Sequence, residues 1–479
     1  MDTEKYLIGN TFTSSTETKD IRNPYTGEVV KQVYKSTRDD VNKALDYLTT
    51  IFSNYKSEPT YIKVSLLETV SKKIFERKED LAQLITTETG KPIKFSHIEI
   101  DRAILTFKLG AEEAKRIEGE VLNLDLLKGS EGKIGIVKRF PVGVILAITP
   151  WNFPINLVAH KLSPALASGN TVLLKPASTS RVCGIELVKI IKESCHENGL
   201  EYCPVNVVTS SGSEINEFLD DDRVKLISFT GSSSVGWGIK EKATKQKVSL
   251  ELGGNAGVII DKDADITLAV SKIITGAFGQ AGQSCISVQR VFVHNDIMDE
   301  FKKKLVDETG KVKFGDPFDD ETISGPMIEE KEAERIEKWV DEAKNNNANI
   351  LTGGKRNGAV FEPTIVDGAG GNAKVNADEV FAPVLTLTGF SDFKEAVKQV
   401  DDSVYGLQAG AFTNNINNAL YAFENIEVGG VVINDVPTYR MDSMPYGGSK
   451  DSGNTREGIK YAIEEMTERR ILVLSKPKE

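Results

Sequence analysis

The spacing of hydrophobic and polar residues changes several times along the chain. From residue 61 to residue 116 apolar residues recur at helical spacing between long charged side chains, which predicts two or three amphipathic helices. Between residues 119 and 139 the pattern alternates, and glycines stand at 129, 132 and 135, which predicts a β-hairpin. One more β-prone stretch, residues 470–474, lies near the end of the chain, and an extra edge strand of this kind often pairs with another subunit.

Two series of short apolar strands alternate with helical segments after residue 142. This alternation is typical of parallel sheets covered by helices on both faces, which bind ligands beyond the carboxyl ends of their strands. We therefore predict an α/β fold with two consecutive α/β domains, joined at a glycine-rich junction, LGGN at 252–255. The predicted strands are 143–149, 171–175, 205–209, 226–230 and 248–252 in the first series, and 257–260, 291–294, 384–388, 407–412 and 430–434 in the second.

Composition excludes several classes of function. With 59 Lys and Arg against 70 Asp and Glu, the net charge of −11 repels phosphate backbones and anionic lipid, so we expect no nucleic-acid partner. The most apolar stretch, residues 142–148, is far shorter than the ~20 residues of a membrane span, and the N-terminus resembles no leader, so we expect no membrane partner and a cytoplasmic location. Four cysteines without C-x-x-C and four histidines without H-E-x-x-H suit neither a disulfide framework nor a metal site, and no metal is expected.

Cys285 is the cysteine whose surroundings indicate chemistry. It stands in GQAGQSCI at 279–286, among small and polar neighbours that offer no apolar core for the thiol to fill. The alternative, a buried cysteine acting as a small hydrophobic residue, is the interpretation we keep for Cys183, Cys195 and Cys203. Cys285 is therefore the candidate nucleophile.

A thiol nucleophile needs a donor for the oxyanion and a base for the hydrolytic water, and both residue types occur at predicted strand ends. Asn152 follows the first strand of the first series, between two prolines that stiffen its loop. Glu251 ends the fifth strand directly before the glycine-rich junction. The alternatives are an asparagine that serves the turn and a surface glutamate that caps a loop.

Signals for phosphate binding are weaker. GSSSVG at 231–236 follows a strand and opens a helix, as a pyrophosphate site would, but it is not G-x-G-x-x-G and equally suits an ordinary turn capped by serines. Lys175 also ends a strand, where a cation faces the hydroxyls or phosphates of a ligand, although alone it is equally a solvated lysine.

Seven motifs together resemble a known family. The chain resembles the NAD(P)-dependent aldehyde dehydrogenase superfamily over nearly its whole length, with the family's motifs in order. These are TPWNFP at 149–154, KPA at 175–177, FTGS at 229–232, ELGGN at 251–255, GQSC at 282–285, EVFAPV at 379–384 and PYGG at 445–448.

The resemblance implies two Rossmann-like α/β domains with a small β oligomerisation unit, in a homodimer or homotetramer. A cofactor-binding domain would comprise 1–118 and 141–253, a catalytic domain 254–458, and oligomerisation segments 119–140 and 459–479. The predicted hairpin fits this third part.

The resemblance also implies roles. Cys285 would form a thiohemiacetal whose oxyanion is held by the Asn152 side chain and the Cys285 backbone N–H, and after hydride transfer Glu251 would activate the water that hydrolyses the thioester. Lys161 and Glu457 match positions suggested to relay protons, although an ion pair on a helix surface remains the rival interpretation. Cofactor contacts would come from Thr149, Pro150, Trp151, Lys175, Ser178, Gly231, Ser232, Leu252, Glu379 and Phe381.

The chain departs from the family pattern near the adenine ribose. NAD-selective members commonly carry a glutamate three residues after the lysine, and here that position is Ser178, with Arg181 nearby. Without the carboxylate nothing repels a 2′-phosphate, so we expect NADP as cofactor, with NAD possible.

The substrate class rests on the loop VPTYRMDSMP at 436–445, which resembles the lactaldehyde, glyceraldehyde and phosphonoacetaldehyde branches. Arg440, joined by Arg102, would bind an anionic group, unless each forms a salt bridge within the fold. We expect oxidation of a small polar aldehyde, a hydroxyaldehyde first. The alternatives are a semialdehyde of the succinate semialdehyde type, phosphonoacetaldehyde, a CoA-acylating enzyme, which Glu251 argues against, and a non-catalytic member.

Overall fold

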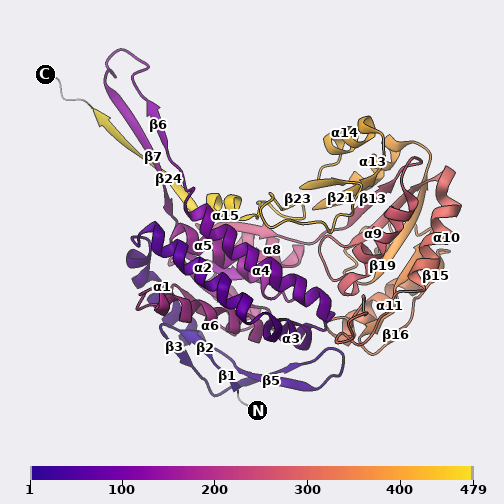
Figure 1. Cartoon of the computed structure of the whole chain (residues 1–479), viewed down its shortest axis with the longest axis horizontal. Coiled ribbons are helices and arrows are strands. Elements are labelled where there is room, and N and C mark those ends of the chain that lie inside the picture. The colour runs from indigo at the N-terminus through magenta and orange to yellow at the C-terminus, as the bar shows by residue number, and fades with distance from the viewer. Residues whose placement is uncertain (1–2, 476–479) are drawn as a thin grey trace.

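Two seven-stranded sheets and a projecting three-stranded arm organise residues 3–475, the part of the chain that the computed structural model describes (Figure 1). The predicted α/β fold class with a small separate β unit is confirmed. No helix within this range combines the length and the apolar composition needed to cross a membrane.

Five parallel strands form the centre of the first sheet, and two antiparallel strands from the N-terminus extend it. Along β8, Ile145 and Ala147 face helices α2 to α6, whereas Val144 and Leu146 face α1, α7 and α8. Burial on both faces explains why these strands are almost continuously apolar in sequence. In sheet order the strands are β12 (Lys247–Glu251), β11 (Val224–Thr230), β8 (Val144–Ile148), β9 (Thr171–Lys175), β10 (Val205–Val207), β2 (Tyr6–Ile8) and β3 (Thr11–Thr13).

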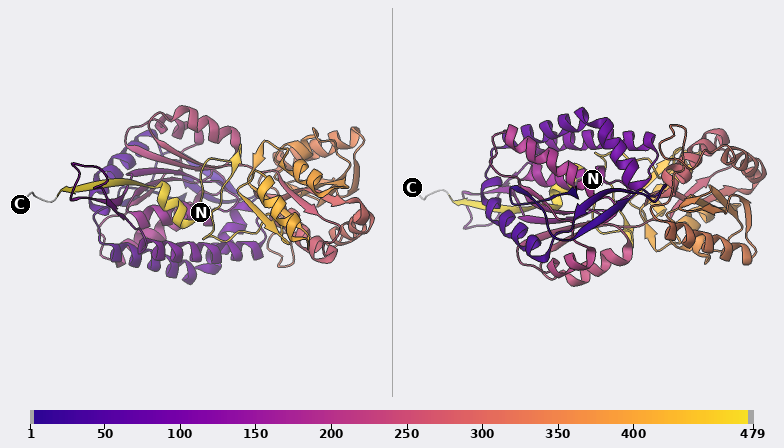
Figure 2. Two further views of the ribbon diagram at one scale, coloured as in Figure 1. Left: turned by 90° about the horizontal axis from the view of Figure 1, so that it is seen from above. Right: turned by 90° about the horizontal axis from the view of Figure 1, so that it is seen from below.

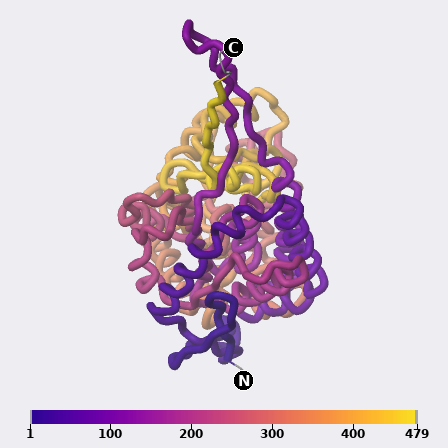
Figure 3. Tube along the Cα trace, turned by 90° about the vertical axis from the view of Figure 1, so that its left-hand side faces the viewer, coloured from indigo at the N-terminus to yellow at the C-terminus, as the bar shows by residue number. Residues whose placement is uncertain are grey.

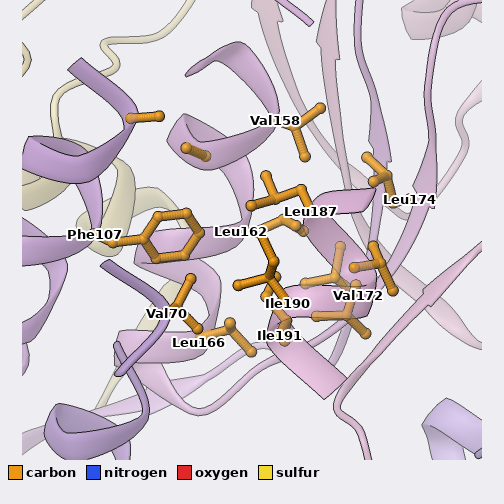
Figure 4. Close-up of a cluster of buried hydrophobic side chains, with 14 of the residues drawn as sticks. Val70, Phe107, Val158, Leu162, Leu166, Val172, Leu174, Leu187, Ile190 and Ile191 are labelled. Carbon is orange, nitrogen blue, oxygen red and sulfur yellow. The ribbon is translucent and has the colours of Figure 1, made fainter. Parts of the chain in front are cut away.

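Large apolar side chains fill the space between this sheet and its main helical layer. Figure 4 shows Phe107, Leu162 and Ile190 converging from three different helices. Truncating one such side chain to alanine typically costs about 2–5 kcal/mol. The region predicted as two or three helices forms three, α2 (Thr60–Glu76), α3 (Lys78–Thr89) and α4 (Ile93–Ala114), beside α1 (Arg38–Tyr55), α5 (Asn156–Ser168), α6 (Arg181–Glu197), α7 (Gly212–Ile215), α8 (Ser233–Lys242) and α15 (Ile459–Glu465).

The second sheet repeats the arrangement, with helices on both faces (Figure 2). Its β15 and β18 were not predicted, because each has only two apolar residues, which stand between polar ones and do not form an apolar run. In sheet order the strands are β15 (Asn349–Thr352), β18 (Thr364–Asp367), β19 (Val384–Phe390), β14 (Val288–His294), β13 (Ala256–Ile260), β21 (Gln408–Phe412) and β22 (Gly430–Ile433). The helices are α9 (Ile266–Phe278) and α10 (Met298–Thr309) on one face, α13 (Phe393–Asp401) and α14 (Ile416–Asn425) on the other, and α11 (Glu330–Asn345).

The predicted hairpin and the C-terminal strand form the projecting arm (Figure 3). Strand β24 (Thr467–Ser475) pairs antiparallel with β7 (Lys133–Pro141), which also pairs with β6 (Glu120–Asn123). The outer edge of β24 is left free in the described chain. A small sheet of β1 (Thr3–Glu4), β5 (Val29–Tyr34) and β4 (Thr18–Arg22) near the N-terminus was not predicted, because β1 and β4 are largely polar and two polar residues interrupt the apolar run of β5.

A buried ion pair fixes the start of α5, the helix that follows the Asn152 loop. Lys91 pairs with Glu99, and both side chains are fully buried. The other oxygen of Glu99 accepts hydrogen bonds from the backbone N–H groups of Ile155 at 2.8 Å and Asn156 at 3.1 Å. A carboxylate there opposes the positive end of the helix dipole, so α4 and α5 are joined beside the predicted site.

Replacing Lys91 by methionine leaves the Glu99 carboxylate buried without a counter-ion. We expect the free energy of unfolding to fall by about 3–5 kcal/mol, measured from equilibrium unfolding in urea. Lys72→Met is the matched control, because Lys72 pairs only with Glu76 and both side chains are more than half exposed. Its effect should stay within about 0.5 kcal/mol, and equal losses in the two variants would contradict the stabilising role of the buried pair.

Candidate active site

One cavity of about 720 Å³ collects most of the residues predicted to carry chemistry. Thr149, Lys161 and Lys175 are buried but do not line it. The predicted residues in its wall are Asn152, Glu251, Cys285, Glu457, Pro150, Trp151, Ser178, Gly231, Ser232, Leu252, Glu379, Phe381, Arg102 and Arg440.

Cys285 lies on an irregular turn between α9 and β14. The turn uses left-handed backbone at Gln280, Ala281 and Gly282, with φ angles of 55°, 55° and 64°. The Cys285 sulfur lies 3.0 Å from the hydroxyl oxygen of Tyr446. Burial raises the pKa of the thiol to about 12, although the contact with Tyr446 acts in the opposite direction. The resting thiol is therefore protonated at neutral pH, and attack on a carbonyl requires a base.

Glu251 ends β12 at the carboxyl edge of the first sheet, as predicted. Its side chain is buried, and neither carboxylate oxygen has a hydrogen-bond partner among residues 3–475. Burial raises the pKa of Glu251 well above its ordinary value, and the negative charge of Glu457 adds to this effect. A buried carboxyl group without partners in a cavity wall is available to exchange protons with whatever occupies the cavity.

Asn152 joins the loop after β8 to the turn that carries Cys285. Its side-chain amide donates to the backbone carbonyl of Gln283 at 3.1 Å, and the backbone carbonyl of Asn152 accepts from the side-chain amide of Gln280 at 2.6 Å. One N–H of the amide remains beyond the bond to Gln283. The two loops, from the two α/β units, are thus held together at the cavity wall.

Lys161, Glu457 and Arg440 form a buried charged cluster. Lys161 donates to Ser228 at 2.9 Å and lies 3.4 Å from Glu457, which also pairs with Arg440 at 3.0 Å. Burial disfavours the charge on Glu457, but the two cations outweigh it and lower its pKa to about 2. The Lys161–Glu457 pair is therefore not on a helix surface; it is enclosed, with side-chain exposures of 2% and 9%.

The two arginines considered for substrate binding are both engaged within the fold. Arg102 binds Asp442 through two hydrogen bonds of 3.1 and 2.7 Å, and His160 binds the same carboxylate at 2.7 Å. Although burial opposes it, these two partners hold the pKa of Asp442 well below its ordinary range. Arg440 retains an Nε without a partner in the described part of the chain. Both guanidinium groups still line the cavity.

Several hydroxyl groups at the carboxyl edge of the first sheet are buried and lack partners within residues 3–475, namely those of Thr149, Thr179, Ser180 and Thr230. Beside them, burial and the charge of Arg181 lower the pKa of Lys175 to about 8. The cavity wall here ends at the start of α8, a position where a helix favours anions. These groups fit a ligand that carries hydroxyl and phosphate groups.

The other end of the cavity contains Glu379 and an aromatic pair. Glu379 accepts a hydrogen bond from the backbone N–H of Gly254 at 3.0 Å. Burial raises the pKa of Glu379 to about 7, although this hydrogen bond lowers it. Trp151 meets Phe381 edge to face, with ring centroids 5.7 Å apart. The described residues contain no group of His, Cys, Asp and Glu suited to holding a metal ion.

Sequence reasoning missed three residues of this site: Tyr446, Asp442 and His160. Tyr446 stands in the PYGG motif, and Asp442 stands in the loop 436–445 on which the substrate class rests, but the sequence predicted a role for neither residue. His160 directly precedes Lys161, and a histidine inside an apolar helix gives no sign of its partner.

Comparison with known proteins identifies the family of the chain. The model of the aldehyde dehydrogenase family matches residues 12–472. The 3-sulfolactaldehyde dehydrogenase of Priestia aryabhattai is 45% identical over 98% of this chain and 97% of its own. The crystal structure of aldehyde dehydrogenase 21 from Physcomitrella patens with the reaction product succinate has a TM-score of 0.96 at 42% identity, covering 99% of this chain and 98% of that one. Glyceraldehyde-3-phosphate dehydrogenase GapN from Methanocaldococcus jannaschii, complexed with NADP, has a TM-score of 0.93 at 38% identity over 96% and 100%. The chain belongs to the aldehyde dehydrogenase family.

Proposed function

We propose that this enzyme oxidises a short polar aldehyde to the carboxylic acid, with Cys285 as nucleophile, Asn152 as oxyanion donor and Glu251 as general base. The observation that carries the proposal is their meeting in the wall of one cavity, to which the two α/β units contribute different members. The intact set, Glu251 included, supports hydrolysis over transfer of the acyl group to CoA.

The sulfur of Cys285 attacks the aldehyde carbon as its proton leaves for a base. The S–C bond forms, the carbonyl electron pair moves to oxygen, and the free amide N–H of Asn152 and the Cys285 backbone N–H receive that oxyanion. A bound nicotinamide supplies the hydride acceptor. Glu251 then takes a proton from the water that attacks the thioester, which releases the acid and the Cys285 thiolate. Glu457 and Lys161, buried beside Glu251, pass that proton onward.

For the cofactor, we propose NADP, with NAD as the alternative. Lys175, Ser178 and the start of α8 would hold the ribose and phosphates, and residues 176–180 contain no carboxylate that would repel a 2′-phosphate. Glu379, Phe381 and Trp151 would hold the nicotinamide end. The NADP complex of the GapN relative supports this assignment.

For the substrate, we propose a hydroxyaldehyde with a polar or anionic far end. Arg440 and Arg102 both line the cavity, and the buried Nε of Arg440 has no partner among residues 3–475. The names of the sulfolactaldehyde and glyceraldehyde phosphate relatives support this class. A semialdehyde is the second candidate, because aldehyde dehydrogenase 21 from Physcomitrella patens was crystallised with the reaction product succinate.

We also propose that the arm mediates a homodimer or homotetramer, and that the chain divides into the cofactor-binding, catalytic and oligomerisation segments given above. Leu472 and its neighbours on β24 are about half exposed, and the strand has a free edge. Among residues 3–475 all four thiols are free, which supports a reducing compartment such as the cytosol.

Glu251→Gln and Asn152→Ala should fail at different steps. Without its base, Glu251→Gln should release about one equivalent of reduced cofactor in a burst, accumulate acyl-Cys285 visible by mass spectrometry, and turn over roughly 10²–10⁴-fold more slowly. Asn152→Ala should lose ~10²–10³ in kcat without accumulating acyl-enzyme, because the slowed step comes before the thioester forms.

Since the pKa of Glu251 is raised, wild-type deacylation should slow as the pH falls and more of the base becomes protonated.

Asn417→Ala, on the exposed face of α14, is the matched control and should keep wild-type kinetics. Steady-state turnover of Glu251→Gln at the wild-type rate, without a burst, would remove Glu251 from the mechanism.

A steady-state panel tests cofactor and substrate together. Lactaldehyde, 3-sulfolactaldehyde, glyceraldehyde, phosphonoacetaldehyde, succinate semialdehyde and hexanal are each assayed with NADP and NAD. We expect kcat/KM to be higher with NADP, and higher for the hydroxyaldehydes than for hexanal by roughly tenfold or more, because buried polar groups discriminate against apolar ligands. A preference for NAD, or for hexanal, would overturn the corresponding assignment.

Removal of the exposed apolar edge tests the assembly. Leu472→Asp should shift the mass measured by light scattering toward that of the monomer, because it places a charge in the proposed interface. A monomeric wild-type protein would contradict the proposal.

A further inference from the structure

The hydroxyl of Tyr446 lies against the sulfur that is proposed to react. The 3.0 Å contact to Cys285 is the one hydrogen bond of that hydroxyl among residues 3–475. Tyr446 is 3% exposed, and it packs with Ile286 and Leu407 around the thiol. Water therefore has little access to the face of the sulfur that Tyr446 covers.

The ring of Tyr446 is held in place from two directions. Its backbone N–H donates to the carbonyl of Glu457 at 3.0 Å, and the N–H of Glu457 donates back at 2.5 Å. On the ring face, the guanidinium carbon of Arg440 lies 3.7 Å from the centroid, and Arg440 is itself fixed by the Glu457 carboxylate at 3.0 Å. The hydroxyl is thus positioned before any ligand enters.

The surroundings also decide which partner donates. Burial raises the pKa of Tyr446 well above its ordinary value, so the phenol keeps its proton. A cation over the ring withdraws electron density from it and makes the O–H a stronger donor. The sulfur of Cys285 is therefore the acceptor, and it accepts most strongly as a thiolate.

We propose that Tyr446 is a catalytic residue, whose hydroxyl donates a hydrogen bond to the Cys285 sulfur and stabilises its thiolate before attack. The proposal rests on Cys285 being the nucleophile. The S–H bond breaks, its proton passes to solvent water, and Tyr446 keeps its own proton throughout. A lower thiol pKa increases the fraction of thiolate but makes each thiolate less nucleophilic. On a logarithmic scale the loss of nucleophilicity is only about half of the gain in thiolate, so a mostly protonated thiol reacts faster when its thiolate is stabilised.

Tyr446→Phe removes the donor and keeps the ring under Arg440. In the full-length protein without cofactor, iodoacetamide alkylation is followed from pH 6 to 10, with peptide mass spectrometry to locate the label on Cys285. The profile of the variant should shift to higher pH, and its rate between pH 7 and 9 should fall roughly three- to tenfold, the net of a larger loss in thiolate fraction and a gain in nucleophilicity. The kcat for the aldehyde should fall by a similar factor, with the KM for the cofactor unchanged.

Tyr55→Phe is the matched control. It removes another buried tyrosine hydroxyl with a single hydrogen bond, to the Leu166 carbonyl at 3.0 Å, outside the cavity. Its alkylation profile should match the wild type. If the melting temperature shows that Tyr446→Phe does not fold, Tyr446→Met removes the same donor and replaces it in the assay.

The two ideas fail in distinguishable ways. A label on Cys285 with an unshifted profile and rate in Tyr446→Phe overturns the role of Tyr446 alone. Turnover by Cys285→Ala, or alkylation that leaves Cys285 unlabelled, overturns the nucleophile and with it the proposal that rests on it.

Discussion

The close passage of Gly254 over the Cys285 carbonyl is the constraint on which the site depends. A Cβ on Gly254 would lie 2.2 Å from that oxygen, and one on Gly253 would lie 2.4 Å from the carboxylate of Glu379. A side chain at Gly254 would clash with backbone, and one at Gly253 would displace the Glu379 carboxylate. The two glycines thus let the end of the first sheet, with Glu251, reach the turn of the second unit that carries the thiol. The first unit contributes Asn152 and Glu251 to the cavity wall and the second contributes Cys285, so the backbone junction brings these side chains to one cavity.

Burial gives the assembled site its chemical character. Burial raises the pKa of the Cys285 thiol to about 12 and that of the Glu251 carboxyl above its ordinary value, whereas Glu457, equally enclosed, has a lowered pKa because two cations flank it. The same low-polarity environment therefore favours the protonated thiol of Cys285 and, through the flanking cations, the charged carboxylate of Glu457.

The sequence permits prediction of whatever depends on local pattern. Five strands of each central sheet follow from short apolar runs, Cys285 from its small polar neighbours, and Glu251 and Asn152 from their places at strand ends. The contacts of Tyr446 and Asp442 were not predictable in this way. Their partners Cys285 and His160 lie 161 and 282 residues away in the chain, and nothing in the local pattern records such a pairing. The polar strands β1 and β4 near the N-terminus were not predicted for a related reason, because their pairing with β5 defines them more than their own residues do.

The position of Arg440, Tyr446 and Glu457 within the last tenth of the chain has a consequence for biosynthesis. Translation proceeds from the N-terminus, and domains generally fold as they emerge. The ribosome completes the thiol and the first sheet long before the hydroxyl, guanidinium and carboxylate that surround them. A nascent or prematurely terminated chain thus contains Cys285 without the groups that enclose it. The enzyme becomes complete only when synthesis is almost finished.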